Sequence, residues 1–352
     1  MKFDYCVGNP PYQIETAQKD TDNGQKTTKR IFGEFQIETE SIAKNICLIY
    51  PAMGWVLGGS KGLKEFGHKQ INDVHLKALK IFRNATDVFP NVGIGDGISV
   101  VLKDMERERE QFDYTYVTEH KEYCIKASHP GDELFIVDPN QISIVDKVKK
   151  YVSQNCLNYL SDSILPQKLF AVESNFVEEN PDKVRLYHDG DILNNNEIKL
   201  YANDKSGKAG RTTWFIIDKK YIPQGQEYID KYKVVVSSAN IASETRDWTF
   251  MVLEPNTAFG RSRLGIKMFN TLDEANNCAK YLNSTIIRFL FCQSGGALTV
   301  VGKLVPDLSN YIDSLDFNKD IDEQLKVMFN ISNDEYNYIS NTTPKNRKEI
   351  SL

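Results

Sequence analysis

The sequence predicts an N-terminal α/β domain with a mainly parallel sheet, followed by a second domain of the α+β class. Short apolar runs at residues 2–8, 46–51, 76–82 and 97–104 are typical of buried strands. Helical patterns separate the first three runs, as in a doubly wound sheet. The last two runs are separated by about fourteen residues without helical periodicity, which predicts an antiparallel hairpin.

Each element of the first domain follows from a local pattern. After the strand at 2–8, residues 26–45 form a loop and an amphipathic helix, in which Ile31, Phe35 and Ile42 recur near helical spacing. The Gly-rich start of residues 58–73 leads into a second helix. The resulting order is β-α-β-α-β-β, and we expect the closing hairpin at an edge of the sheet.

The texture changes beyond about residue 108, where we place the domain boundary, giving domains of 1–108 and 109–352. The second domain contains short strand-like runs with turn signals between 180 and 260. Helices are predicted within 139–160, 272–294 and 322–340, the last including a capped helix that starts at Ser332.

Composition excludes several classes of protein. The sequence contains no run of about 18 apolar residues, so no membrane span is predicted. The N-terminus lacks a secretory pattern, and we therefore expect a cytoplasmic protein. The six cysteines form no CxxC pair and the five histidines show no metal-ligand spacing, so no metal site is predicted. The net charge of −5 counts mildly against nucleic-acid binding, although a local basic face is sufficient for phosphate contacts.

A rigid polar corner, Asn9-Pro10-Pro11-Tyr12, follows the first strand. Two prolines fix the backbone and end the strand. The Asn9 side-chain oxygen and the Pro10 carbonyl are two acceptors that can hold an exocyclic amine and direct its lone pair, without reorganisation during the reaction. Tyr12 offers a flat face for a base taken out of its stack. The alternative interpretation is a structural turn.

This corner, in "FDYCVGNPPYQ", resembles the catalytic motif of gamma-class N6-adenine DNA methyltransferases of type II restriction–modification systems. Residues 49–73 and 81–104 also resemble the segments that follow the motif in this family, and the later chain resembles its target-recognition region more weakly. The resemblance implies a Rossmann-like methyltransferase sheet, double-stranded DNA as substrate and S-adenosylmethionine as cofactor. It also implies that Phe89 stacks on the flipped adenine opposite Tyr12; the alternative is a core phenylalanine.

One part of the family pattern is missing. The resemblance implies a strand, a Phe-x-Gly-x-Gly loop and a helix before the catalytic motif, and eight residues leave no room for them. "GIGDG" (93–97) precedes a strand rather than a helix, so we interpret it as a hairpin connection. "GGSKG" (58–62) lacks the order of a phosphate loop. We therefore expect an unpaired apolar edge at residues 3–8, and a separate polypeptide that supplies the N-terminal half.

Candidate DNA contacts are cations on Gly-rich or polar loops. The alternative for each of them is ordinary solvated charge. The candidates are Lys26, Lys29, Arg30, Lys205, Lys208, Arg211, Arg246, Arg261 and Arg263, with Lys267 in the same stretch as the last two.

The sequence thus favours part of an adenine-specific DNA methyltransferase with catalytic residues Asn9, Pro10, Pro11 and Tyr12. Two alternatives stay open. In the first, the chain is a DNA-recognition subunit or an inert remnant that binds DNA without catalysis. In the second, it methylates RNA or protein glutamine with the same chemistry.

Overall fold

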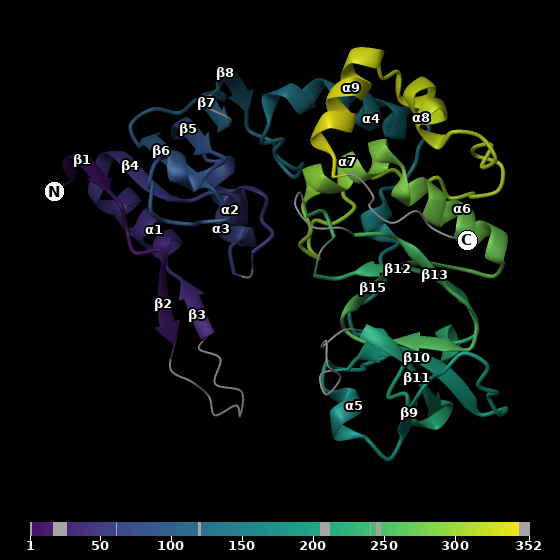
Figure 1. Ribbon diagram of the computed structural model, residues 1–352. Helices are drawn as coiled ribbons and strands as arrows, with labels where there is room; N and C mark the ends of the chain where they lie inside the picture. Colours follow the sequence, from purple (N-terminus) through teal and green to yellow (C-terminus); the bar gives the residue numbers. More distant parts are fainter. Residues whose placement is uncertain are drawn as a thin grey trace. The chain divides into compact units, whose positions relative to one another are not determined.

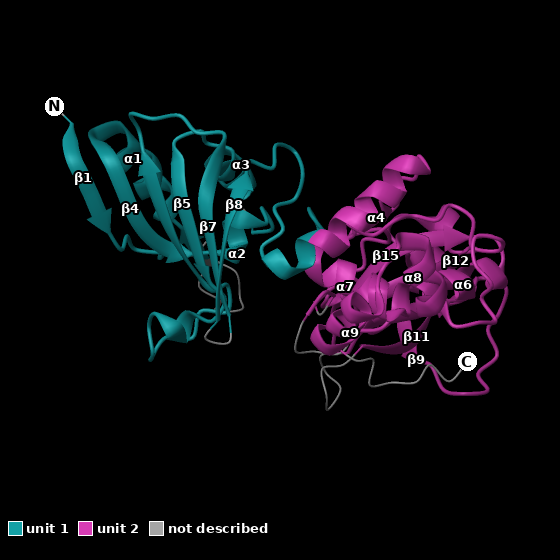
Figure 2. Cartoon of the chain, turned by 90° about the horizontal axis from the view of Figure 1, so that it is seen from above, with its two compact units in different colours: residues 1–142, 297–300 teal, residues 143–296, 301–352 magenta. Residues whose placement is uncertain are grey.

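The computed structural model describes residues 2–16, 27–60, 62–118, 121–204, 212–239, 241–243 and 248–344 (Figure 1). The chain divides into two compact units (Figure 2). The first contains residues 1–142 and 297–300, and the second contains 143–296 and 301–352. Each unit is described by itself.

The first unit is built on a six-stranded sheet of order β1-β4-β6-β5-β7-β8. Strands β1, β4, β5 and β7 run parallel, and β6 and β8 run in the opposite direction. The strands are β1 (Phe3–Gly8), β4 (Ala43–Pro51), β5 (Leu76–Phe82), β6 (Ile98–Asp104), β7 (Gln111–Thr118) and β8 (Lys121–Ser128). Between them lie the hairpin β2 (Gln13–Thr16) and β3 (Thr27–Arg30), and helices α1 (Phe32–Ile42), α2 (Met53–Val56), α3 (Lys64–Ile71) and η1 (Ala85–Asp87).

The four strands predicted for this unit are confirmed, as is the antiparallel pairing of the last two. The edge position of that hairpin is wrong. Strand β6 inserts between β4 and β5 and forms antiparallel ladders with both. Its alternate residues Val101 and Lys103 are fully buried, as a central strand requires. Local sequence predicts that the runs of β5 and β6 pair with each other. It does not show that β4 pairs with the other side of β6.

The sheet also continues beyond the boundary that we placed at residue 108. Strand β7 pairs in parallel with β5, and β8 pairs with β7. The buried faces of these strands carry Phe112, Tyr114 and Tyr116, which join the same hydrophobic core as β4 and β5. The first unit consequently extends to residue 142.

Helices α1, α2 and α3 cover one face of the sheet, where Phe32, Trp55 and Tyr50 form an aromatic cluster. The expected buried stripe of α1 is partly wrong. Ile31 is buried, but Phe35 and Ile42 are exposed, and the helix packs through Phe32, Gly33 and Gln36. At Gly33, a side chain would press on the ring of Phe66, so the close approach of α1 selects glycine.

The second unit combines two small sheets with a group of helices. The sheets have the orders β14-β10-β11-β9 and β13-β12-β15. The strands are β9 (Val184–Leu186), β10 (Glu197–Asn203), β11 (Thr212–Asp218), β12 (Tyr232–Ser237), β13 (Met251–Leu253), β14 (Thr257–Phe259) and β15 (Arg263–Phe269). The helices are η2 (Pro139–Gln141), which leads from the first unit into α4 (Ile142–Gln154), η3 (Leu160–Asp162), α5 (Phe176–Glu179), η4 (Lys219–Tyr221), η5 (Gln226–Tyr228), α6 (Leu272–Asn283), α7 (Thr285–Ser294), α8 (Ile321–Phe329) and α9 (Asn333–Thr342).

The three predicted helical regions of this unit are confirmed, with breaks that the sequence explains. Ser284 separates α6 from α7, and Asn330 in the left-handed region ends α8. A capping box starts α9, because Ser332 accepts from the Glu335 amide while the Glu335 carboxylate accepts from the Ser332 amide.

Candidate functional site

The carboxyl ends of β1, β4, β5 and β7 lie at one edge of the first sheet, since these strands are parallel. The segments that follow them carry residues 9–12, 52–60 and 83–97. Ligands of open α/β sheets bind outside this edge. The predicted catalytic corner therefore lies where such a fold places a binding site.

Asn9 to Tyr12 form the turn between β1 and the hairpin β2–β3. Asn9 is exposed, whereas Tyr12 is half-buried and packs against the core. The amide of Ile31 donates to the Tyr12 carbonyl at 3.1 Å, which ties the corner to the start of α1. Burial raises the pKa of the Tyr12 hydroxyl, and the adjacent Asn9 side chain partly opposes this. The Asn9 side chain therefore lies beside the buried Tyr12 hydroxyl.

Phe89 follows β5 at the same edge of the sheet and is half-buried. Its amide donates to the Ala85 carbonyl at 2.8 Å, which fixes the loop that carries it. In the sheet order, β5 lies three positions from β1, or about 14 Å at the usual strand spacing. Phe89 and Tyr12 therefore lie at the same end of the sheet, but they follow two strands that are not neighbours in it.

Arg30, a predicted DNA contact, forms an ion pair at this edge. Its Nη1 lies 2.9 Å from the Asp96 carboxylate. The Asp96 carbonyl accepts from the Met53 amide at 3.0 Å, so the 93–97 loop is tied to the start of α2. At Gly54 a side chain would collide with the Arg30 guanidinium, so glycine leaves room for this ion pair. Sequence reasoning missed Asp96, because 66 positions separate the partners (96 − 30) and no local pattern links them.

The other described DNA candidates also have partners within their own units. Lys29 pairs with Glu34 at 2.6 Å, and Arg261 pairs with Glu173 at 3.0 Å. Lys267 pairs with the buried Asp307 at 2.5 Å. Lys26, Lys205, Lys208, Arg211 and Arg246 lie outside the described residues.

Arg263 belongs to an aromatic cluster that sequence reasoning missed. Its guanidinium carbon lies 4.8 Å from the centre of the Tyr201 ring, and Nη2 donates to the Tyr201 hydroxyl at 3.0 Å. Tyr201 in turn packs on Trp214, with ring centres 4.7 Å apart. The pair results from the antiparallel register of β10 and β11, which places Tyr201 opposite Trp214. The sequence of either strand alone does not predict this contact, because the contact depends on the register between β10 and β11.

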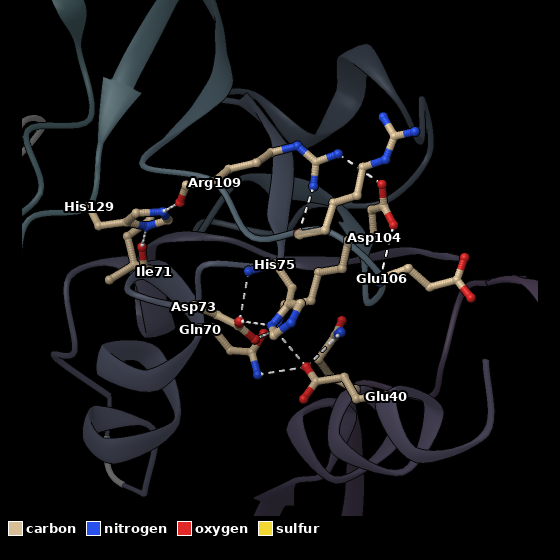
Figure 3. Close-up of polar contacts among 12 residues, drawn as sticks. Glu40, Gln70, Ile71, Asp73, His75, Asp104, Glu106, Arg109 and His129 are labelled. Carbon is tan, nitrogen blue, oxygen red and sulfur yellow. Dashed lines mark hydrogen bonds and ion pairs between the residues drawn. The ribbon is translucent and has the colours of Figure 1, made fainter. Parts of the chain in front are cut away.

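A polar cluster lies at the opposite end of the first sheet, near the amino ends of its parallel strands (Figure 3). The fully buried Lys103 bonds to Glu40 at 2.6 Å and to Asp73 at 2.5 Å. Burial alone raises the pKa of Asp73, but hydrogen bonds from Lys103 and His75 outweigh it and hold that pKa below its usual value. Since the cluster joins the end of α1 to the starts of β4 and β5, we interpret it as structural.

The described residues do not fit S-adenosylmethionine by themselves. A cofactor loop needs a strand before it and a helix after it. The loop at 93–97 leads into strand β6, as predicted, and the glycines at 58 and 59 follow helix α2 rather than a strand.

The described part of the chain contains no cluster of three or more His, Cys, Asp or Glu that could hold a metal. None of the helices in that part is long and apolar enough to cross a membrane.

Comparison with known proteins finds similarity to adenine methylases in the N-terminal part of the chain. Residues 1–89 match the model of the Eco57I restriction-modification methylase family. The chain is also 31% identical over 99 residues to an uncharacterized adenine-specific methylase of Mycoplasma pneumoniae (strain ATCC 29342 / M129 / Subtype 1). The match covers 28% of this chain and 22% of that relative. The predicted resemblance to restriction–modification adenine methylases is thereby confirmed for the N-terminal part of the chain.

Solved structures of restriction enzymes are similar at a low level. The type IIL enzyme MmeI in complex with DNA has a TM-score of 0.40 and 8% identity, covering 85% of this chain and 45% of that one. The type IIG endonuclease BpuSI has a TM-score of 0.29 and 10% identity, covering 86% and 45%. TM-scores below 0.5 do not establish a common fold. The chain spans less than half of each of these proteins.

Proposed function

We propose that this chain binds the target adenine and recognises DNA as part of a site-specific N6-adenine DNA methyltransferase of a restriction–modification system. A segment outside residues 1–352 supplies most of the S-adenosylmethionine site. One observation carries the proposal: Asn9-Pro10-Pro11-Tyr12 stands at the carboxyl end of a parallel strand, within a segment that matches a methylase family.

The chemistry of the corner supports an amine substrate. The exposed Asn9 amide oxygen and the Pro10 carbonyl accept the two hydrogens of the adenine amine, which directs its lone pair outward. The prolines hold both acceptors in place before the base arrives. Tyr12 stacks on one face of the extruded base, and Phe89, on a loop at the same edge, stacks on the other.

DNA recognition is assigned to the second unit, together with the hairpin after the catalytic corner. Lys29 and Arg30 contribute positive charge beside the corner, and Arg261 and Arg263 contribute it in the second unit. Arg263 is the strongest of these candidates, since Tyr201 orients its guanidinium and leaves it partly exposed. An oriented guanidinium suits hydrogen bonding to a guanine edge.

A DNA-binding protein without catalysis is the second candidate. It is favoured by one observation: the described residues contain no complete loop for the cofactor. The two candidates differ in whether the chain transfers methyl groups to DNA in the presence of the missing half.

The test is transfer of a labelled methyl group to adenine in DNA, by the chain alone and together with the polypeptide encoded immediately upstream. We expect activity only with both, and a loss of at least about 100-fold in Asn9→Ala, because one of two acceptors is removed. Val327→Ala, an 84% exposed residue in the second unit, is the matched control. The proposal fails if no mixture methylates adenine, or if Asn9→Ala retains full activity.

A further inference from the structure

The two aromatic rings of the proposed base site follow strands that are not neighbours in the sheet. Tyr12 follows β1 and Phe89 follows β5, and strands β4 and β6 lie between these two. A base that is held between two rings requires a defined distance between them. Since the strands leave the two rings apart, contacts between the loops set that distance.

Arg30 ends the hairpin that follows the corner and is fixed to the corner by backbone contacts. In the antiparallel register of β2 and β3 it stands opposite Gln13, the residue after Tyr12. The next amide along the chain, that of Ile31, donates to the Tyr12 carbonyl at 3.1 Å. A displacement of Arg30 is therefore transmitted to the backbone of Tyr12.

Asp96 belongs to the loop that carries Phe89. The Phe89 carbonyl accepts from the Val92 amide at 3.0 Å, and this turn leads directly into residues 93–97. Gly97 has a φ of 63° and no room for a side chain, which fixes the other end of the loop. A displacement of Asp96 is therefore transmitted to Phe89.

The side chains of Arg30 and Asp96 join these two parts of the site. Nη1 of Arg30 lies 2.9 Å from the Asp96 carboxylate, and the two side chains are 34% and 36% exposed. An ion pair that is this exposed adds little to folding stability. Its main consequence is geometric, because it holds the hairpin against the loop.

The first turn of α2 is shaped around this ion pair. A side chain at Gly54 would collide with Nη1 of Arg30 and press on the Asp96 carboxylate. The Asp96 carbonyl also accepts from the Met53 amide at 3.0 Å. The pair is thus confined on the α2 side as well, which a cation that reaches out to a phosphate does not require.

We propose that Arg30 and Asp96 are a positioning pair, whose ion pair sets the spacing between Tyr12 and Phe89 and thereby the fit of the flipped adenine. The proposal rests on the proposed function and adds two residues that act through Tyr12 and Phe89. It gives Arg30 a role in shaping the base site rather than in binding a phosphate. A displacement of about 1 Å in such a site lowers a reaction rate by about 100-fold.

Substitution of either partner tests the pair. Arg30→Gln and Asp96→Asn remove opposite charges, so an electrostatic effect on DNA would have opposite signs, whereas a loss of positioning has the same sign. In the mixture that is active in the labelled-methyl assay, each variant should lower kcat about 10- to 100-fold and change the KM for DNA less than about twofold. The double variant should be no worse than either single variant, because the same contact is lost.

Three further variants separate position from charge. Arg30→Lys retains the charge and should recover part of the kcat that Arg30→Gln loses. Gly54→Ala keeps both charges but occupies the space of the guanidinium, so it should lower kcat as the single variants do. Lys126→Gln breaks an exposed ion pair with Asp113 on the edge strand β8, and as the matched control it should leave kcat unchanged. Circular dichroism of each variant checks that it folds.

Hydrogen exchange tests the pair without DNA or cofactor. In the chain alone, Asp96→Asn should speed exchange of the Ile31 amide at the corner by about 2- to 5-fold. Arg30→Gln should speed exchange of the Met53 amide, which donates to the Asp96 carbonyl, by a similar factor. Each substitution thus acts across the pair on the opposite segment, and Lys126→Gln should change neither amide.

The positioning pair is overturned if both single variants keep kcat within about twofold of the parent value. It is also overturned if Arg30→Gln raises the KM for DNA while Asp96→Asn lowers it, because Arg30 would then be a phosphate contact. Unchanged exchange at both amides would contradict it equally.

These outcomes separate the positioning pair from the proposed function. If no mixture methylates adenine but both exchange effects appear, the coupling of the two loops is kept and the proposed function is removed. Methyl transfer with a normal kcat in both single variants keeps the function and removes the positioning pair.

Discussion

Tyr12 links the proposed catalytic corner to the core, because it packs on the core while its neighbour Asn9 stays exposed. Tyr12→Ala should lower affinity for a flipped base by about 5- to 150-fold, since stacking on an aromatic ring contributes about 1–3 kcal/mol per base. Fluorescence of 2-aminopurine at the target position measures the extruded base. Tyr12→Phe retains the ring and should behave nearly as the parent; equal signals for Ala and Phe would contradict a stacking role.

Lys103 is a fully buried cation that pairs with two carboxylates in the first unit. Lys103→Met leaves Glu40 and Asp73 without their cation and should cost about 3–5 kcal/mol at neutral pH. Lys80→Met breaks a more exposed pair and should cost less than about 1 kcal/mol. Urea unfolding of both variants provides the comparison.

The pH dependence of Lys103→Met has a definite sign. In the parent, the lowered pKa of Asp73 contributes stability above its unfolded value, about 3.9, which is lost as the pH falls through the folded pKa. In the variant, burial remains without Lys103, so the pKa of Asp73 rises and the carboxyl protonates more readily. The difference between parent and variant should therefore shrink from pH 7.5 to pH 5. A constant difference would show that Asp73 is not the group responsible.

Among single residues, a contiguous motif can be found in the sequence, but ion pairs between distant residues cannot. The corner at 9–12 could be recognised because its residues are contiguous. The ion pairs of Arg30 with Asp96 and of Arg261 with Glu173 join distant segments, and they place a carboxylate beside two candidate phosphate contacts. A cation on a loop predicts DNA contact only when no carboxylate of the fold lies beside it.

At the scale of elements, helix α3 packs against α2 through a glycine. A side chain at Gly67 would overlap the Trp55 carbonyl, a backbone atom that cannot swing away. Gly67→Ala should therefore destabilise the protein by about 1–3 kcal/mol, despite the higher helix propensity of alanine. Gly95→Ala meets no neighbour within 4 Å and should change stability by less than about 1 kcal/mol. Thermal unfolding of both variants decides; equal melting temperatures would refute the packing contact.

The sheet shows which elements a sequence predicts well. Strands β1, β4, β5 and β6 were recognised because each is a short apolar run with turn residues beside it. The insertion of β6 and the addition of β7 to β5 depend on contacts between strands distant in the chain, which no local pattern encodes. Helix α1 was found, but its buried face was misassigned, because Phe32 and Gly33 rather than Phe35 meet the aromatic cluster.

At the scale of the whole molecule, net charge and internal ion pairs limit electrostatic attraction to DNA. The chain carries a net charge of −5, and Lys29, Arg30 and Arg261 already have carboxylate partners. We expect fewer than about six phosphate contacts, hence a log–log slope of affinity against salt shallower than about −5. Fluorescence anisotropy on DNA between 50 and 300 mM salt (a range set by the usual screening regime) measures it.

A matched variant tests the cause of that slope. Glu173→Gln removes the carboxylate beside Arg261 and should steepen the slope by about one if Arg261 then meets a phosphate. Glu34→Gln removes the carboxylate beside Lys29 and should steepen the slope by the same amount if Lys29 then meets a phosphate. A parent slope near −10, or no change in either variant, would contradict this account.

The central position of β6 has a consequence for the order of folding. Ile46 pairs with Lys103, so the middle of the sheet closes only after a loop of more than fifty residues has been brought together. During synthesis, β4 and β5 leave the ribosome before the strand that joins them. Until residue 104 emerges, both expose apolar ladders that can join wrongly, and this stretch of chain is the one that most needs a chaperone.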